Sequence, residues 1–224
     1  MTKTLETNEA AAQSGRMSGD ERRSQILLVS IRLFSQHGFS GTTTKEIARQ
    51  AGVSEAMVFR HFATKSELYD AILDHKACQG GMNPLPWEEN SPLKSIAEKD
   101  DDFAFFYNLA LNALNKQQTD PDFMRLLFHS ALEENELAER FFEEFIARIY
   151  DFVGSYIGRR QTDGAMREVE PRIVVRAFLG MIIHHSLNNI LWDKSRRLLD
   201  ITNEEAAHAF AEILLRGVLK EKQA

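Results

Sequence analysis

Three Ser/Thr-x-x-Glu sequences, beginning at Ser18, Thr43 and Thr64, lie close together near the start of the chain. Each has the pattern of a capping box, in which a hydroxyl and a carboxylate satisfy backbone N–H groups at the start of a helix. This local signal fixes helix starts more firmly than hydrophobic periodicity alone. The sequence also lacks the sustained apolar-polar alternation that is typical of strands. We therefore predict an all-α protein.

The predicted helices form a short N-terminal group and a longer C-terminal group. The break between them covers residues 79–98, where Gly and Pro interrupt the periodicity, and we place the domain boundary there. We predict a disordered tail over residues 1–18, a small domain over 19–79 and a larger helical domain over 80–224. The N-terminal helices are expected at 19–37, 43–51, 55–62 and 64–78, and the C-terminal helices at 101–117, 121–132, 135–161, 170–192 and 203–220.

Composition narrows the class of protein. The single cysteine, Cys78, cannot form an intramolecular disulfide, and no Cys/His spacing suggests a zinc site, so we expect a cytoplasmic protein without metal or cofactor. The longest apolar stretch, within 173–183, is too short to cross a bilayer, so we expect no contact with a membrane. Residues 19–78 carry eight Lys/Arg and seven Asp/Glu, a net charge of +1, whereas residues 79–224 carry 17 and 24, a net charge of −7. Any contact with DNA therefore belongs to the N-terminal part.

Residues 43–62 have the pattern of a helix-turn-helix motif, in which Gly52 supplies the turn. In this geometry the second helix enters the major groove of DNA while the first crosses the backbone. The hydroxyls of Thr43 and Thr44 and the charge of Lys45 stand at a helix start, where a phosphate is favoured. Lys65 stands at the next helix start and is also suited to a phosphate.

These residues resemble the TetR family of bacterial regulators. The resemblance rests on Arg23 to Leu27, Leu33-Phe34, Gly38-Phe39, the segments 42–48 and 51–54, and His61 to Leu68. It implies an N-terminal three-helix DNA-binding domain that a fourth helix joins to a C-terminal helical domain for ligand binding and dimerisation. Carried over by position, the DNA-contacting residues are Thr43, Thr44, Lys45, Ser54, Glu55, Ala56, Met57, Phe59, Arg60, His61 and Lys65.

Individual residues in the motif leave alternatives open. Phe59 stands where the family usually has tyrosine, and Ala56 stands where it often has glycine, so a phosphate-reaching hydroxyl and a close backbone approach are lost. Glu55 is acidic, and it either stabilises the helix start or reads a cytosine amino group.

Two sets of residues in the second domain are candidates for further sites. The helix 170–192 is apolar nearly all round in its first half, which requires burial on two sides and suggests a two-fold interface with the last helix. The candidates for this homodimer interface are Ile173, Ala177, Phe210, Ile213, Leu214 and Gly217. The candidates for a pocket that takes a partly apolar effector are Phe103, Phe106, Tyr107, Phe128, Phe141, Phe145, Met181 and His184, although aromatic residues at helical spacing also build ordinary cores.

The sequence therefore predicts a homodimeric regulator that binds a double-stranded DNA operator, most simply a repressor that a small molecule releases through the helix 64–78. An enzyme with a di-iron site is the first alternative, but it needs two Glu-x-x-His pairs, and only Glu205 with His208 fits. The second alternative is a DNA-binding architectural or adaptor protein without an effector. An enclosed cavity in the second domain would distinguish a ligand-responsive repressor from a DNA-binding protein without an effector.

Overall fold

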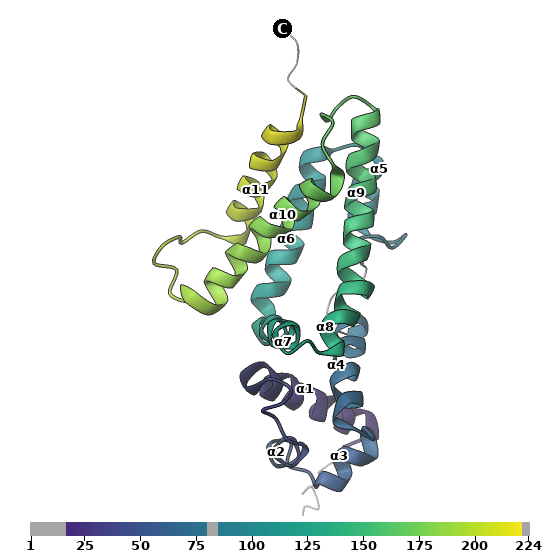
Figure 1. Cartoon of the computed structure of the whole chain (residues 1–224), viewed down its shortest axis with the longest axis vertical. Coiled ribbons are helices and arrows are strands. Elements are labelled where there is room, and N and C mark those ends of the chain that lie inside the picture. Colours follow the sequence, from purple (N-terminus) through teal and green to yellow (C-terminus); the bar gives the residue numbers. More distant parts are fainter. Residues whose placement is uncertain (1–16, 80–84, 221–224) are drawn as a thin grey trace, which may run out of the picture.

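The computed structural model describes residues 17–79 and 85–220, with the side chains of 77–79 excepted, and its regular elements are helices (Figure 1). The predicted all-α fold is confirmed. Of the tail predicted over 1–18, residues 1–16 lie outside the described residues, and Ser18 caps the first helix.

The N-terminal helices form a compact head at one end of the molecule (Figure 1). Only the first predicted capping box is complete, since Ser18 and Glu21 exchange both hydrogen bonds. Thr43 accepts from the Glu46 N–H, but the Glu46 carboxylate pairs with Arg49 and Gln50. The head contains α1 (Gly19–His37), α2 (Thr44–Gln50), α3 (Glu55–His61) and α4 (Lys65–Gln79).

The C-terminal helices build the upper part of the molecule, where α6 packs on α11 and α9 packs on α10 (Figure 1). Two predicted long helices, 135–161 and 170–192, each contain one π-helical turn. Hydrophobic periodicity does not indicate such a turn, because it adds a single residue to one turn of an otherwise continuous helix. The elements are α5 (Pro92–Glu98), α6 (Asp102–Thr119), α7 (Pro121–Leu132), α8 (Glu136–Phe141), η1 (Phe142–Ile146), α9 (Ala147–Thr162), α10 (Pro171–Leu187), η2 (Asn188–Trp192) and α11 (Asn203–Val218).

The predicted break at 79–98 was wrong in its second half, because α5 lies there. Ser91 caps this helix by accepting from the Leu93 N–H, and Pro92 occupies its first position. Proline is tolerated there because the first turn of a helix leaves its N–H groups without intrahelical partners. Pro92 thus starts a helix in this chain.

Two hydrophobic cores hold the molecule together, and they divide the chain differently from the predicted boundary. The upper core is built from α5, α6, α9, α10 and α11. The core of the head includes the predicted inward stripe of α1, with Ile26 and Phe34 fully buried, but also takes Phe123, Leu126 and Leu137 from α7 and α8. The head is therefore completed by residues that lie well beyond residue 79.

Candidate DNA-binding surface and effector cavity

The helix-turn-helix begins with α2 and turns at Gly52, whose φ of 64° is a left-handed value that favours glycine. Val58 and Phe62 are buried in the head and fix the inner face of α3. Thr44 Oγ1 donates to Glu55 Oε1 at 2.6 Å, so the first turns of α2 and α3 are tied together. Glu55 is thus a partner of Thr44 and a helix-start residue in this structure.

The outer face of α3 presents the side chains that a recognition helix would use. Ala56, Phe59 and Arg60 are exposed, whereas Met57 and His61 are half-buried. Phe59 is a large apolar side chain with 45% exposure, and an apolar side chain suits the methyl group of thymine. Arg60 makes no side-chain hydrogen bond or ion pair within the described part of the chain, so its guanidinium is available to a guanine.

The predicted phosphate-binding residues fall into two groups. Thr43, Lys45 and Ser54 are exposed at the starts of α2 and α3, and the two hydroxyls, which accept backbone N–H groups, can still donate their own protons. Lys65 differs, because its Nζ donates to the Phe39 carbonyl and lies 4.1 Å from the Phe39 ring centroid. Partial burial lowers the pKa of Lys65. The Phe39 carbonyl uses one of the three N–H donors of Lys65, so a phosphate contact would use the other two or require the side chain to leave Phe39.

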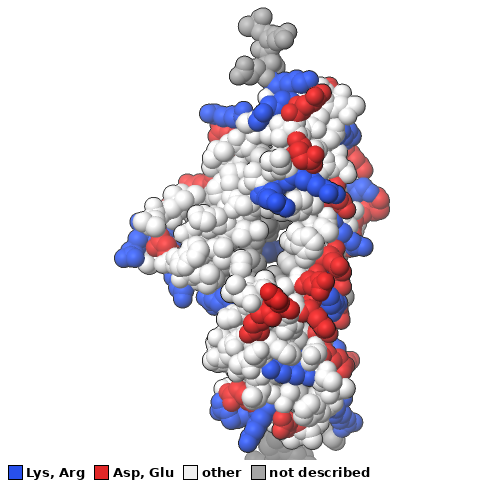
Figure 2. Space-filling model, viewed as in Figure 1, with Lys and Arg blue, Asp and Glu red and all other residues white. Residues whose placement is uncertain are grey.

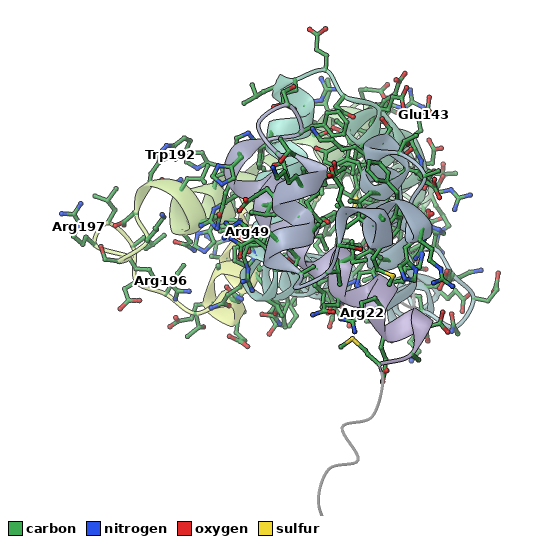
Figure 3. All side chains as sticks on the ribbon, turned by 90° about the horizontal axis from the view of Figure 1, so that it is seen from below. Arg22, Arg49, Glu143, Trp192, Arg196 and Arg197 are labelled. Atoms are coloured by element: carbon green, nitrogen blue, oxygen red, sulfur yellow. The ribbon has the colours of Figure 1, made fainter. Side chains whose placement is uncertain are left out.

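Seen from the end of the head, the arginines fall into separate regions (Figure 3). Arg22 and Arg49 lie on the head, on α1 and α2. Trp192, Arg196 and Arg197 lie on the arm formed by η2 and the loop that leads to α11. The basic side chains of this arm are therefore remote from the recognition helix.

A cavity of about 350 Å³ lies in the upper domain, directly above α7. Its walls are mostly apolar and come from α6, α7, η1 and α10, with Leu109, Met124 and Ile182 as examples. Three polar side chains, Asn112, Lys116 and Gln117, line the part formed by α6. A hollow on the face shown in Figure 2 lies in the upper domain, and none of the described residues of α1 to α4 lines the cavity.

Of the residues predicted for an effector pocket, Phe141 and Phe145 line this cavity. The other six do not. Phe106 is fully buried in the upper core, Phe103 is exposed beside His208, and Tyr107 and Phe128 are half-buried on other faces. Met181 and His184 line a separate shallow groove near Phe210. Periodicity placed these side chains on helices but did not fix which helix faces which cavity.

α7 and α8 link this cavity to the head. Met124 and Leu127 of α7 line the cavity, and both also contact the core of the head, to which Leu127 belongs together with Phe123 and Leu126. Phe39 N donates to Glu133 Oε2 at 3.0 Å, just beyond the end of α7. Arg140 of α8 binds Asp74 of α4 at 3.2 Å, and the next residue, Phe141, lines the cavity.

The residues predicted for a dimer interface gather on one face of α10 and α11. A single shallow groove between these helices is lined by Ile173, Ala177, Ile213, Leu214 and Gly217. Phe210 is half-buried beside this groove. Ile173 and Ile213 are each more than 60% exposed, at 63% and 61%. Few charged side chains cover α10 and α11 in the view of Figure 2.

Two observations bear on metal binding and on membrane insertion. The described residues hold no group of three His, Cys, Asp or Glu side chains that could bind a metal ion, and Glu205 completes a capping box with Thr202. None of the described helices is long and apolar enough to cross a membrane.

Residues 26–72 match the model of the bacterial regulatory proteins, tetR family. This segment contains α2, α3 and the turn between them, together with most of α1 and α4. The DNA-binding segment of this chain is therefore similar to that of the TetR family. The expected resemblance and the expected class of function, a DNA-binding transcriptional regulator, are confirmed.

Two curated relatives and one solved structure illustrate how far the similarity extends. The transcriptional regulator AcrR of Shigella flexneri is 36% identical over 81 residues, which are 36% of this chain and 38% of that protein. The nucleoid occlusion factor SlmA of Vibrio campbellii is 27% identical over 76% of this chain and 84% of its own. The crystal structure of NalD, the secondary repressor of the MexAB-OprM multidrug efflux pump in Pseudomonas aeruginosa, aligns with a TM-score of 0.65 and 24% identity, covering 92% of this chain and all of that one.

Proposed function

We propose that this protein is a homodimeric, sequence-specific transcriptional repressor, without catalytic activity, that releases its operator when a small molecule occupies the cavity above α7. The observation that carries this proposal is the double role of α7. Because α7 lines the cavity and also completes the core of the head, where it packs on α1, a ligand that displaces α7 should also displace α1.

A second connection runs through α8. A ligand pressing on Phe141 would shift Arg140, which holds Asp70 and Asp74 of α4. The sequence suggests α4 alone as the link, whereas these contacts support a pair of links, α7 to α1 and α8 to α4. Both links support coupled movement of the head and the cavity wall.

The expected effect on DNA follows from dimer geometry. Two recognition helices must lie roughly 34 Å apart to enter successive major grooves, so a small rotation of each head weakens both contacts together. A coupling of about 1–3 kcal/mol is typical between two sites of this kind, and DNA must weaken the ligand by the same factor. The ligand acts only through its preference for the arrangement that does not fit DNA.

The DNA-binding part of the proposal is tested with an operator selected from a library of random duplexes. Arg60→Ala should weaken binding to this operator by about 1–3 kcal/mol and relax the preference at one base pair. Arg197→Ala, on the remote arm, is the matched control and should bind like the wild type. Equal footprints and affinities for the wild type and Arg60→Ala would refute the assignment of α3.

The release step is tested by screening small apolar compounds for thermal stabilisation and then titrating each hit with and without operator. Compounds that bind the cavity should bind about five- to a hundredfold more weakly in the presence of operator. Ala113→Trp, which fills the cavity, should abolish the stabilisation. A cavity ligand with the same affinity in both titrations would show that the site does not control DNA binding.

A second candidate function is an architectural DNA-binding protein without an effector. It is favoured by the long alignment with SlmA, which is named as a nucleoid occlusion factor. This alternative predicts that no compound in the cavity changes operator affinity. The same pair of titrations therefore distinguishes the two functions.

A further inference from the structure

The cavity has two chemically different sides. Most of its wall is apolar, but Asn112, Lys116 and Gln117 follow one another within little more than a turn of α6. Asn112 and Lys116 are four residues apart, so they lie on the same face of the helix, one turn above the other. No Asp or Glu is among the residues that line the cavity.

Lys116 lacks the kind of partner that three other lysines have. Lys76 pairs with Asp120, Lys94 pairs with Glu89, and Lys65 donates to a backbone carbonyl. Lys116 makes no hydrogen bond or ion pair within the described residues, and desolvation lowers its pKa although the residue as a whole is exposed. Its side chain thus lines the cavity and also reaches solvent, and an unpaired ammonium group at this position can bind an anion.

Gln117 supplies an independent indication. Its side-chain Oε1 is buried without a hydrogen-bond partner, and an unsatisfied buried polar atom costs about 1–3 kcal/mol. Because the two ends of an amide are nearly equal in shape, Gln117 can present either its carbonyl or its NH₂ group to the cavity. Because Oε1 is covered by protein atoms, a ligand with polar oxygen atoms would reach this amide group when the side chain turns toward the cavity that it lines.

Resting on the proposed function, we propose that the effector is an apolar carboxylate, whose charged end binds Lys116 and Gln117 and whose apolar body fills the space between α6, η1 and α10. The size of the cavity, about 350 Å³, lies at the lower end of the range of ligand pockets, which suits a single alkyl chain or one ring system.

The test uses three probes with the same chain length: decanoate, decanol and decyltrimethylammonium. Binding is followed by tryptophan fluorescence in a Trp192→Phe background, because Trp87 lies 5.5 Å from Phe145, measured between ring centroids, and Phe145 lines the cavity. The removed Trp192 is 67% exposed. Decanoate should bind more tightly than decanol, and the cation should bind most weakly.

Substitutions locate the charge effect. Lys116→Met should weaken decanoate binding by about tenfold or more, the loss of one charge-assisted hydrogen bond, and leave decanol binding unchanged. Lys116→Arg should retain the preference for decanoate. Lys99→Met removes an exposed lysine outside the cavity and controls for the change in net charge.

Equal affinities for decanoate and decanol, equal losses in Lys116→Met and Lys99→Met, or no binding of decanoate would overturn this inference. Those results would leave the release of operator by other cavity ligands intact. A decanoate complex that binds operator as tightly as the free protein would contradict the proposed function instead.

Discussion

Gly38 and Glu133 meet at the contact between the head and the upper domain. Gly38 has a φ of 70°, and a Cβ built there would lie 2.2 Å from Glu133 Oε1. The backbone conformation favours glycine here, and a larger residue would also displace the carboxylate that receives the Phe39 N–H. Gly38 was predicted as the end of α1 from local chemistry, but its contact with Glu133 joins residues far apart in sequence and leaves no local pattern.

His185 gives a pH-dependent prediction at the scale of one residue. Burial lowers its pKa, and the charges of Arg196 and His184 lower it further, so the folded protein keeps it neutral where the unfolded chain takes up a proton. Stability is therefore full above the ordinary pKa of histidine, about 6.5, and falls as the pH drops below it. His185→Gln should reduce the loss of Tm between about pH 7 and pH 5.

The control for this prediction is His208→Gln, which changes an exposed histidine of α11. Its Tm should fall with pH as the wild-type Tm does. Thermal unfolding followed by circular dichroism measures both variants, and identical pH profiles for wild type and His185→Gln would contradict the prediction.

Lys116 and Gln117 show why the candidate site was only partly predictable. Polar residues near the end of a helix are typical of a solvated face, and the other walls of the cavity that these two line come from α7, η1 and α10. The exposed residues of α3 were easier to predict from the sequence, because Val58 and Phe62 define the buried face of this short helix within one motif. Local chemistry is visible in a sequence, but cavities depend on how helices pack.

At the scale of the element, α7 serves the core of the head and the wall of the cavity with overlapping sets of residues. Phe123 and Leu126 belong to the head core alone, whereas Met124 and Leu127 contact the head core and also line the cavity. The sequence predicts this helix within one residue, since Asp120 caps it and Pro121 starts it. The sequence does not predict that α7 contacts both the head and the cavity, because the apolar character of a side chain does not indicate which other helices it will pack against.

Leu126→Ala tests this arrangement. Leu126 is fully buried, and its truncation should lower the free energy of unfolding by about 2–5 kcal/mol. Because the cavity left behind adjoins α1, amide hydrogen exchange in α1 should also accelerate. Urea unfolding and exchange measured residue by residue check both effects.

Ile183→Ala is the matched control. Ile183 is half-buried and lines the cavity from α10, outside the core of the head, so its truncation should cost less stability and leave exchange in α1 close to that of the wild type. Equal effects of the two substitutions on α1 would show that Leu126 does not stabilise α1 through the core of the head.

At the scale of the whole molecule, the exposed apolar face of α10 and α11 supports assembly. Gly180 and Gly217 have open space where a Cβ would lie, so another helix could approach these positions closely. A two-fold pairing of α10 and α11 would make a four-helix bundle between two copies and leave both heads on the same side.

Ile213→Asp should disrupt this pairing, because it places a charge at the centre of the apolar face. We expect a monomer in sedimentation velocity at micromolar concentration and a large loss of operator affinity, since a monomer holds only one recognition helix. Leu132→Asp, at an exposed leucine at the end of α7, should remain dimeric. A dimer of unchanged stability in Ile213→Asp would refute this interface.

The shared helix α7 also limits how this protein can be recombined with its relatives. A chimera that joined residues 17–79 to the upper domain of another regulator would lose Phe123, Leu126 and Leu137, which fill the core of the head. A functional graft would have to carry residues 121–137 with the DNA-binding segment, although some forty residues of sequence separate them. The unit that can be exchanged is therefore defined by packing and is discontinuous in the chain.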